Sequence, residues 1–141
     1  MKYDRTMARR RAVQALYQWH QSGEDLHEIE TQFLVDQDMS RVDVPFFQEL
    51  LRGVPRCVEE LDGYLQPHLD RPIKEVDPVE RAVLRIGAYE LRYHMEVPYR
   101  VVINEAVDAA KVYGADQSHR YINGVLDKVA KNLRAVELQS Q

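Results

Sequence analysis

The sequence predicts an all-α fold, a compact bundle of six to seven helices. Apolar residues recur at helical spacing through most of the 141-residue chain, and prolines, glycines and capping residues divide this pattern into helices of ordinary length. No segment alternates apolar and polar residues for long enough to predict a strand. The segment "YRVVI" at 99–103 has strand propensity, but the helical period continues through it into "NEAVDAAKVYG".

The first predicted helix spans about residues 5–21. A helical wheel divides it into an apolar side with Ala8, Ala12, Ala15, Leu16 and Trp19 and a polar side with Arg10, Arg11, Gln14, Gln18 and Gln21. Arg9 is the exception, because it projects near the apolar stripe. It must either lie at a frayed helix start or extend its charged end past the core. Ser22 and Gly23 are expected to end the helix.

Two further helices complete the N-terminal half of the chain. One is predicted at about 25–35, and the segment "DQDMSRVDV" after it is typical of a loop. A long helix then runs from about 45 to 66, with Pro45 in its first turn. Pro55 lies inside this helix and predicts a kink, because proline lacks a backbone donor.

The segment "PHLDRP" at 67–72 is the predicted boundary between two small helical subdomains, about 1–68 and 69–137, within a single domain of residues 1–141. "DPVE" at 77–80 signals a helix start, with Asp77 as N-cap. The helix after it is apolar around most of its circumference, which predicts a central position.

Two more helices are predicted in the C-terminal half. One spans about 99–113 and ends at Gly114. The last begins at a cap on Asp116 or Ser118 and reaches about residue 133, and the tail 137–141 is expected to fray.

Composition is that of an ordinary soluble globular domain, with 45% apolar and 30% charged residues. The single cysteine, Cys57, cannot form an internal disulfide and suits a reducing compartment. No apolar run approaches the roughly 18 residues that a membrane span needs, and no signal-peptide pattern follows the basic N-terminus. We therefore expect a cytoplasmic protein that makes no membrane contact.

Neither a catalytic nor a metal-binding motif is found. The five histidines never occur at the i, i+4 spacing of a helical zinc site, and no second cysteine accompanies Cys57. Nucleotide-binding glycine motifs and nucleophile elbows are absent from the sequence. A Cys57–His dyad stays open, but a small core residue is the simpler interpretation of Cys57. We expect no enzyme activity, no cofactor and no metal.

Charge is unevenly distributed in a chain whose formal net charge is −4. Residues 1–23 hold five basic side chains and one acid, whereas residues 24–43 hold seven acids and Arg41. Arginines in a first helical turn oppose the helix dipole, so stability does not explain them. Arg5, Arg9, Arg10 and Arg11 are candidate RNA-phosphate contacts, with Tyr17 as a ring for base stacking. The alternative for the arginines is that they only keep the surface soluble, and the alternative for Tyr17 is a half-buried position in the core.

A second polar cluster, "QSHRYING", occupies residues 117–124. If the last helix begins near Ser118, then His119, Arg120 and Asn123 lie off its apolar stripe. The first backbone amides of this helix are then suited to bind a phosphate. Gln117, His119, Arg120 and Asn123 are therefore further RNA-binding candidates. The alternative is structural, with Ser118 as the cap and Asn123 and Gly124 serving close helix packing.

Three blocks of the sequence resemble a known family. "ARRRAVQALYQW", "VERAVLRIGAYEL" and "VPYRVVINEAVDAAKVYGADQSHRYINGVLDKVAK" are similar to signature blocks of the NusB family of bacterial antitermination factors. The resemblance extends from Ala8 to Lys131 and so covers nearly the whole chain.

The resemblance implies an all-helical protein of two small subdomains that binds boxA RNA of ribosomal-RNA transcripts through its arginine-rich N-terminus. It also implies a heterodimer with NusE, a small-subunit ribosomal protein, within the antitermination complex that forms on RNA polymerase with other Nus factors. The C-terminal half carries much of the partner surface in the family, so Glu80, Arg81 and Tyr89 are expected to be exposed partner contacts. A homodimer that covers the RNA surface is left open.

Gln117 departs from the family pattern, since this position is acidic in some relatives. A neutral amide removes a repulsion with RNA, so Gln117→Asp is expected to weaken RNA binding modestly. Two alternatives to an antitermination factor stay open. One is a NusB-like module that serves ribosomal-RNA processing or modification, as in cytosine methyltransferases, although no cofactor-binding domain follows in this sequence. The other is a protein-interaction module with solubilising arginines.

Overall fold

The computed structural model describes the backbone of residues 2–139 and the side chains of residues 5–139. Within that range the fold is all-α, as predicted, with eight α-helices and two short 3-10 helices, η1 and η2. The elements in chain order are α1 (Lys2–Ser22), α2 (Leu26–Asp36), α3 (Val44–Arg56), α4 (Val58–Leu65), η1 (Gln66–His68), η2 (Ile73–Glu75), α5 (Pro78–Tyr93), α6 (Tyr99–Tyr113), α7 (Ser118–Leu133) and α8 (Ala135–Gln139).

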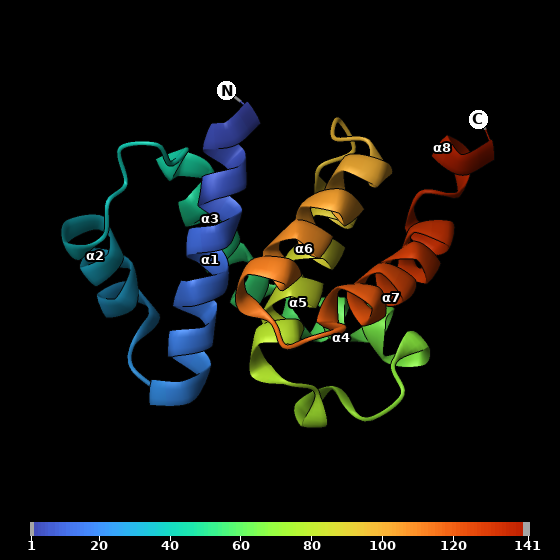
Figure 1. Ribbon diagram of the computed structural model, residues 1–141, viewed down its shortest axis with the longest axis horizontal. Helices are drawn as coiled ribbons and strands as arrows, with labels where there is room; N and C mark the ends of the chain where they lie inside the picture. The colour runs from blue at the N-terminus through green and yellow to red at the C-terminus, as the bar shows by residue number, and fades with distance from the viewer. Residues whose placement is uncertain (1, 140–141) are drawn as a thin grey trace.

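Helix α5 lies at the centre of the bundle, and α1, α3, α4, α6 and α7 pack against it (Figure 1). Ten of its residues are buried, which confirms the central position predicted from its apolar circumference. Its start is also as predicted, because the Asp77 carboxylate accepts hydrogen bonds from the amides of Val79 and Glu80. Helix α2 flanks α1 on the outer side, and α6 lies between α1 and α7 (Figure 1).

The long helix predicted at 45–66 is in fact two helices. Pro55 supplies no backbone N–H, and two residues later the chain leaves helical geometry at Cys57, with φ −103° and ψ 15°. The Cys57 carbonyl still accepts from the Leu61 amide, so α4 begins at once in a new direction. The expected kink is therefore a complete break.

The start of α7 differs from the prediction as well. Neither Asp116 nor Ser118 caps the helix; the N-cap is Gln117, which adopts left-handed geometry with φ 69° and accepts no capping hydrogen bond on its side chain. Ser118 is buried, and its hydroxyl is satisfied there because it donates to Glu80 of α5 at 2.8 Å. At the other end, residues 135–139 form α8, where a frayed tail was expected from 137, while residues 140–141 of that tail lie outside the described range.

Close approach of helices to α5 depends on glycine at two positions. A Cβ on Gly53 of α3 would lie 2.7 Å from the ring of Tyr89, and one on Gly87 would lie 2.7 Å from Leu126 of α7. Between α4 and α5, η1 and η2 occupy the segment where the subdomain boundary is predicted. Helix α5 packs on helices of both halves of the chain. The division into two subdomains at 67–72 therefore stays a prediction.

Candidate nucleic-acid interface

Helix α1 presents one polar ridge to solvent. Arg10, Gln14, Tyr17 and Gln21 follow the i, i+4, i+7, i+11 spacing and form what we call the α1 ridge. The opposite side is fixed by Ala8, Ala12 and Ala15, which have no solvent exposure. Arg10 makes no hydrogen bond or ion pair with any residue of the described range, so its guanidinium is available to a ligand.

Arg9 does not share this exposure. Its residue exposure is 6%, and its guanidinium donates to both carboxylate oxygens of Glu90, at 2.8 and 2.7 Å. Burial acts to lower the pKa of Arg9, but the hydrogen bonds and charge of Glu90 outweigh it and the pKa is raised. Neither arrangement expected from the wheel is present, because a buried partner satisfies the charge. The Arg9 guanidinium is therefore engaged inside the bundle, and its role as an RNA contact stays a prediction.

Arg11 lies next to the ridge on the polar side of α1, whereas Arg5 lies one turn before Arg9 on the side that faces α3. The Arg5 guanidinium lies 4.4 Å from the ring centre of Phe46, and its nitrogens are 3.8 Å from carboxylate oxygens of Asp43 and Glu96. Arg11 donates to the Gln14 side chain at 3.3 Å and to the Asp38 carbonyl at 3.4 Å, both long contacts. Both side chains keep donors that a phosphate can use.

A hollow of about 510 Å³ lies beside the ridge between α1 and α2. Tyr17 lines it, with 38% of its surface exposed and its hydroxyl accepting a hydrogen bond from Gln21 at 3.0 Å. The other lining residues are Gln14, Gln18, Gln21, Ser22, Phe33 and Gln37. We call this site the Tyr17 hollow. The sequence pattern placed Gln14, Gln18 and Gln21 on the polar side of α1. It did not predict their shared hollow, because the other wall comes from Phe33 of α2 and from Gln37 at the end of α2.

The second predicted cluster lies on α7. Gln117, Arg120 and Asn123 are exposed and His119 is half-buried. Arg120 lines a separate open hollow of about 510 Å³ between α7 and the segment Pro67–Asp70. Because α6 lies between α1 and α7, the structure does not bring this cluster onto the α1 ridge (Figure 1).

The expected partner contacts are less exposed than predicted. Arg81 is 4% and Tyr89 5% exposed, while Glu80 is half-buried and accepts from Ser118. Arg81 donates to the carbonyls of Ile73 and Lys74 at 3.3 Å. Tyr89 donates to Glu49 of α3 at 2.8 Å, and burial together with that carboxylate raises its pKa. The prediction that Arg81 and Tyr89 are exposed was wrong, because distant backbone and side-chain acceptors satisfy their polar groups.

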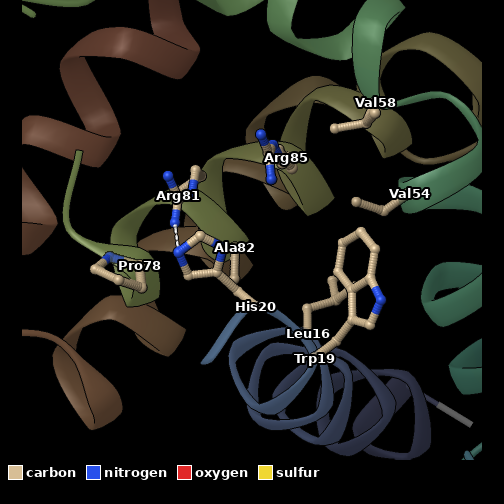
Figure 2. Close-up of a pocket in the computed structure, with 9 residues that line it drawn as sticks. All are labelled: Leu16, Trp19, His20, Val54, Val58, Pro78, Arg81, Ala82 and Arg85. Atoms are coloured by element: carbon tan, nitrogen blue, oxygen red, sulfur yellow. Dashed lines mark hydrogen bonds between the residues drawn. The ribbon is translucent and has the colours of Figure 1, made fainter. Parts of the chain in front are cut away.

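Arg81 also contacts His20, which closes a small cavity between α1 and α5 (Figure 2). The cavity has a volume of about 10 Å³, room for one water molecule. Burial and the charges of Arg81 and Arg85 lower the pKa of His20, so the imidazole accepts from Arg81 in its neutral form. This cavity is a packing feature and too small for a ligand.

Within residues 2–139, no helix is long and apolar enough to cross a bilayer. The described side chains contain no group of three or more His, Cys, Asp or Glu that could hold a metal ion.

The model of the NusB family matches residues 6–131, which is most of the chain. The chain belongs to the NusB family. Over its whole length it is 55% identical to the transcription antitermination protein NusB of Nitrosococcus oceani, of which it covers 95%. It is also 55% identical to that of Actinobacillus pleuropneumoniae serotype 5b over 129 residues, or 92% of this chain and 94% of that protein.

Solved NusB structures have the same fold. A crystal structure of the antitermination factors NusB and NusE with double-stranded RNA is similar at TM-score 0.78 and 29% identity, over 94% of this chain and 98% of that one. The solution structure of NusB from Aquifex aeolicus is similar at TM-score 0.78 and 28% identity, over 96% of this chain and 93% of that one. The α1 ridge and the Tyr17 hollow are thus features of a NusB fold.

Proposed function

We propose that this NusB family member is an RNA-binding transcription antitermination factor. With NusE, it binds boxA RNA of ribosomal-RNA transcripts as a single strand and supports antitermination by RNA polymerase together with other Nus factors. It acts by binding rather than catalysis, in the cytoplasm where transcription takes place. The names of its relatives and the NusB–NusE–RNA complex among its structural neighbours support this proposal.

The α1 ridge is the observation that carries the proposal. It sets an unpaired cation, two amides and an exposed aromatic ring along one side of a helix in a chain of net charge −4. Such a combination suits a single strand, whose phosphates take the cations and whose unstacked bases take the ring and the amides. Arg11 extends the cationic edge of the ridge, and Arg5 adds a partly exposed cation near the start of α1.

The α7 cluster is a secondary RNA contact in this proposal. Gln117 lies in the α6–α7 connection, and His119, Arg120 and Asn123 follow it in the first turns of α7. The NusE surface in this proposal includes Glu80, which is half-buried at the start of α5. Arg81 and Tyr89 are buried, so they contribute to it through the packing of α5 rather than by exposed contacts.

Fluorescence anisotropy with labelled RNA tests the proposal. Three RNAs are compared with and without NusE: a boxA-type single strand, a scrambled single strand of the same composition, and the boxA strand paired as a duplex. We expect the tightest binding for the boxA single strand with NusE. Equal affinity for the two single strands in both conditions contradicts specific recognition, and tighter binding of the duplex contradicts the single-strand assignment.

A further inference from the structure

His94, at the end of α5, is held between two carboxylates from different parts of the fold. Its Nε2 lies 2.6 Å from Oε2 of Glu49 on α3, and its Nδ1 lies 2.8 Å from Oε2 of Glu96 in the turn before α6. The imidazole is largely enclosed, with 12% of the side chain exposed, and it meets the Phe46 ring edge-on at 5.3 Å.

This geometry requires a protonated imidazole. A neutral histidine has one donor and one acceptor nitrogen, and its acceptor would then face a carboxylate oxygen at hydrogen-bond distance. Only the imidazolium donates from both nitrogens. Burial acts to lower the pKa of His94, but the hydrogen bonds that the imidazolium donates to Glu96 and Glu49 outweigh it, so the pKa is raised.

Glu96 connects this imidazole to Arg5 on α1. The oxygen that accepts from His94 is the same Oε2 that lies 3.8 Å from the Arg5 guanidinium. His94 therefore competes with Arg5 for one carboxylate oxygen and holds it at the shorter distance. Arg5 is left with two ion pairs of 3.8 Å, to Glu96 and to Asp43, and with 36% of its side chain exposed.

The other charged and titratable groups around His94 leave this competition intact. Tyr89 of α5 donates to Glu49, and its ring centre lies 6.1 Å from the imidazole. Arg134, after α7, donates to the His94 carbonyl at 2.9 Å and pairs with Glu137 of α8. From α1, Arg9 lies over Phe46, but its charge is taken up by Glu90 and Glu105.

We propose that His94 is a positioning residue for phosphate binding at Arg5: as an imidazolium it retains Glu96 and Glu49 and offsets one of their two charges, which leaves the Arg5 guanidinium free to bind RNA phosphate. When His94 loses its proton, Glu96 turns to Arg5 and the local charge becomes one unit more negative. Affinity for RNA then decreases. The inference rests on the proposed function, since it concerns the cation near the start of α1 that the proposal assigns to RNA phosphate.

The test is the affinity for the boxA-type single strand, measured by anisotropy from pH 6 to pH 8.5 at constant salt. One added negative charge near a phosphate site weakens binding by about threefold to tenfold at the distances and screening of a protein surface. We expect the wild-type affinity to fall by about that factor as the pH rises. His94→Gln should bind with the weak affinity at every pH, because Glu96 is then released throughout the range.

Recovery of RNA affinity in a double variant distinguishes a positioning role of His94 from a merely structural one. In the double variant His94→Gln/Glu96→Gln, no carboxylate competes for Arg5, so tight binding should return and stay independent of pH. Glu96→Gln alone should lose less affinity than the wild type between pH 6 and pH 8.5, because no carboxylate then turns to Arg5 and only the Glu49 charge becomes unbalanced. Since 61% of the Glu96 side chain is exposed, the variant should fold normally. His27→Gln, at an exposed histidine of α2, is the matched control and should keep the wild-type profile.

A wild-type profile in His94→Gln, or no rescue by Glu96→Gln, overturns the inference. Arg5→Gln distinguishes this failure from that of the proposed function. If Arg5→Gln binds as tightly as the wild type, Arg5 holds no phosphate and the inference is wrong, while binding through Arg10 and Tyr17 still supports the function. If the wild-type chain binds the boxA strand at no pH, both are wrong.

Discussion

Arg9 of α1 and Glu90 of α5 form a bidentate ion pair inside the bundle, with side chains only 7% and 2% exposed. Buried charges require partners, because an unpaired one costs several kcal/mol. The pair therefore fixes how α1 is rotated against α5, and the α1 ridge faces solvent as a result. Glu105 of α6 adds a second contact, at 3.7 Å from Arg9.

Replacing both members of this pair should separate its structural role from RNA binding. Arg9→Met or Glu90→Met alone leaves one buried charge unpaired, and we expect a loss of about 3–5 kcal/mol in the free energy of unfolding. The double variant should recover most of that loss, since similar-sized apolar side chains fill the site and Glu105 keeps its hydrogen bond from Thr6. Urea unfolding measures the stabilities. A folded double variant that has lost RNA affinity would show that Arg9 contacts RNA after all.

His20 should make stability depend on pH. Its pKa is lowered in the folded state, so the neutral form is favoured and its contribution is present above the unfolded pKa of about 6.5. The contribution is lost as the pH falls through the lower folded value. His20→Gln keeps an acceptor for Arg81 but does not titrate. We expect it to match the wild type at pH 8 and to exceed it in thermal stability at pH 5.

An equal loss of stability at pH 5 in both proteins would assign the acid sensitivity to other groups. His94 cannot mimic this result, because its pKa is raised and its contribution is lost in the opposite direction, as the pH rises.

Two glycine-to-alanine substitutions in neighbouring helices should have opposite effects. At Gly53 the added Cβ meets the Tyr89 ring, which is held by its hydrogen bond to Glu49, so we expect a loss of about 1–3 kcal/mol. At Gly63 of α4 nothing lies within 4 Å, and alanine should add about 0.5–1 kcal/mol through its higher helix propensity. Denaturant midpoints check both. If Gly53→Ala left the denaturant midpoint unchanged, α3 and α5 would be able to move apart at little cost.

Gln117 combines an unfavourable backbone geometry with a predicted RNA contact. Asn and Asp tolerate left-handed φ better than Gln, so Gln117→Asn and Gln117→Asp should both be slightly more stable than the wild type. Only the aspartate adds a charge, and it alone should weaken RNA binding, by a factor that shrinks with added salt. Equal RNA affinity of the two variants at all salt concentrations would place Gln117 away from the RNA.

The positions of the helices, and the side of each helix that is buried, were predictable because they depend on local periodicity. The wheel of α1 assigned its buried alanines and placed Arg10, Gln14 and Gln21 on the polar side, although not Tyr17, and "DPVE" gave the Asp77 cap that the structure contains. The break at Cys57 was underestimated, since the pattern shows that Pro55 removes a donor but not whether the chain bends or leaves the helix.

The fate of buried polar side chains was not predictable in this way. The partner of Arg9 lies 81 residues away on α5, and Arg81 is satisfied by carbonyls of η2. Exposure was wrongly expected for Arg81 and Tyr89, because the resemblance placed the partner surface on this half of the chain and the sequence did not show which polar side chains of α5 are buried. Burial of a polar group depends on a tertiary acceptor, and a single sequence does not show which distant group supplies it.

The central claim is that the α1 ridge binds RNA, and the salt dependence of affinity in one pair of variants tests it most directly. Arg10→Gln removes an unpaired cation of the ridge, and Lys131→Gln removes an exposed cation from the last turn of α7. If Arg10 contacts a phosphate, Arg10→Gln should weaken boxA binding and lower the slope of log K against log salt by about 0.7. Lys131→Gln should leave both unchanged. Identical slopes and affinities for Arg10→Gln and the wild type would contradict the account.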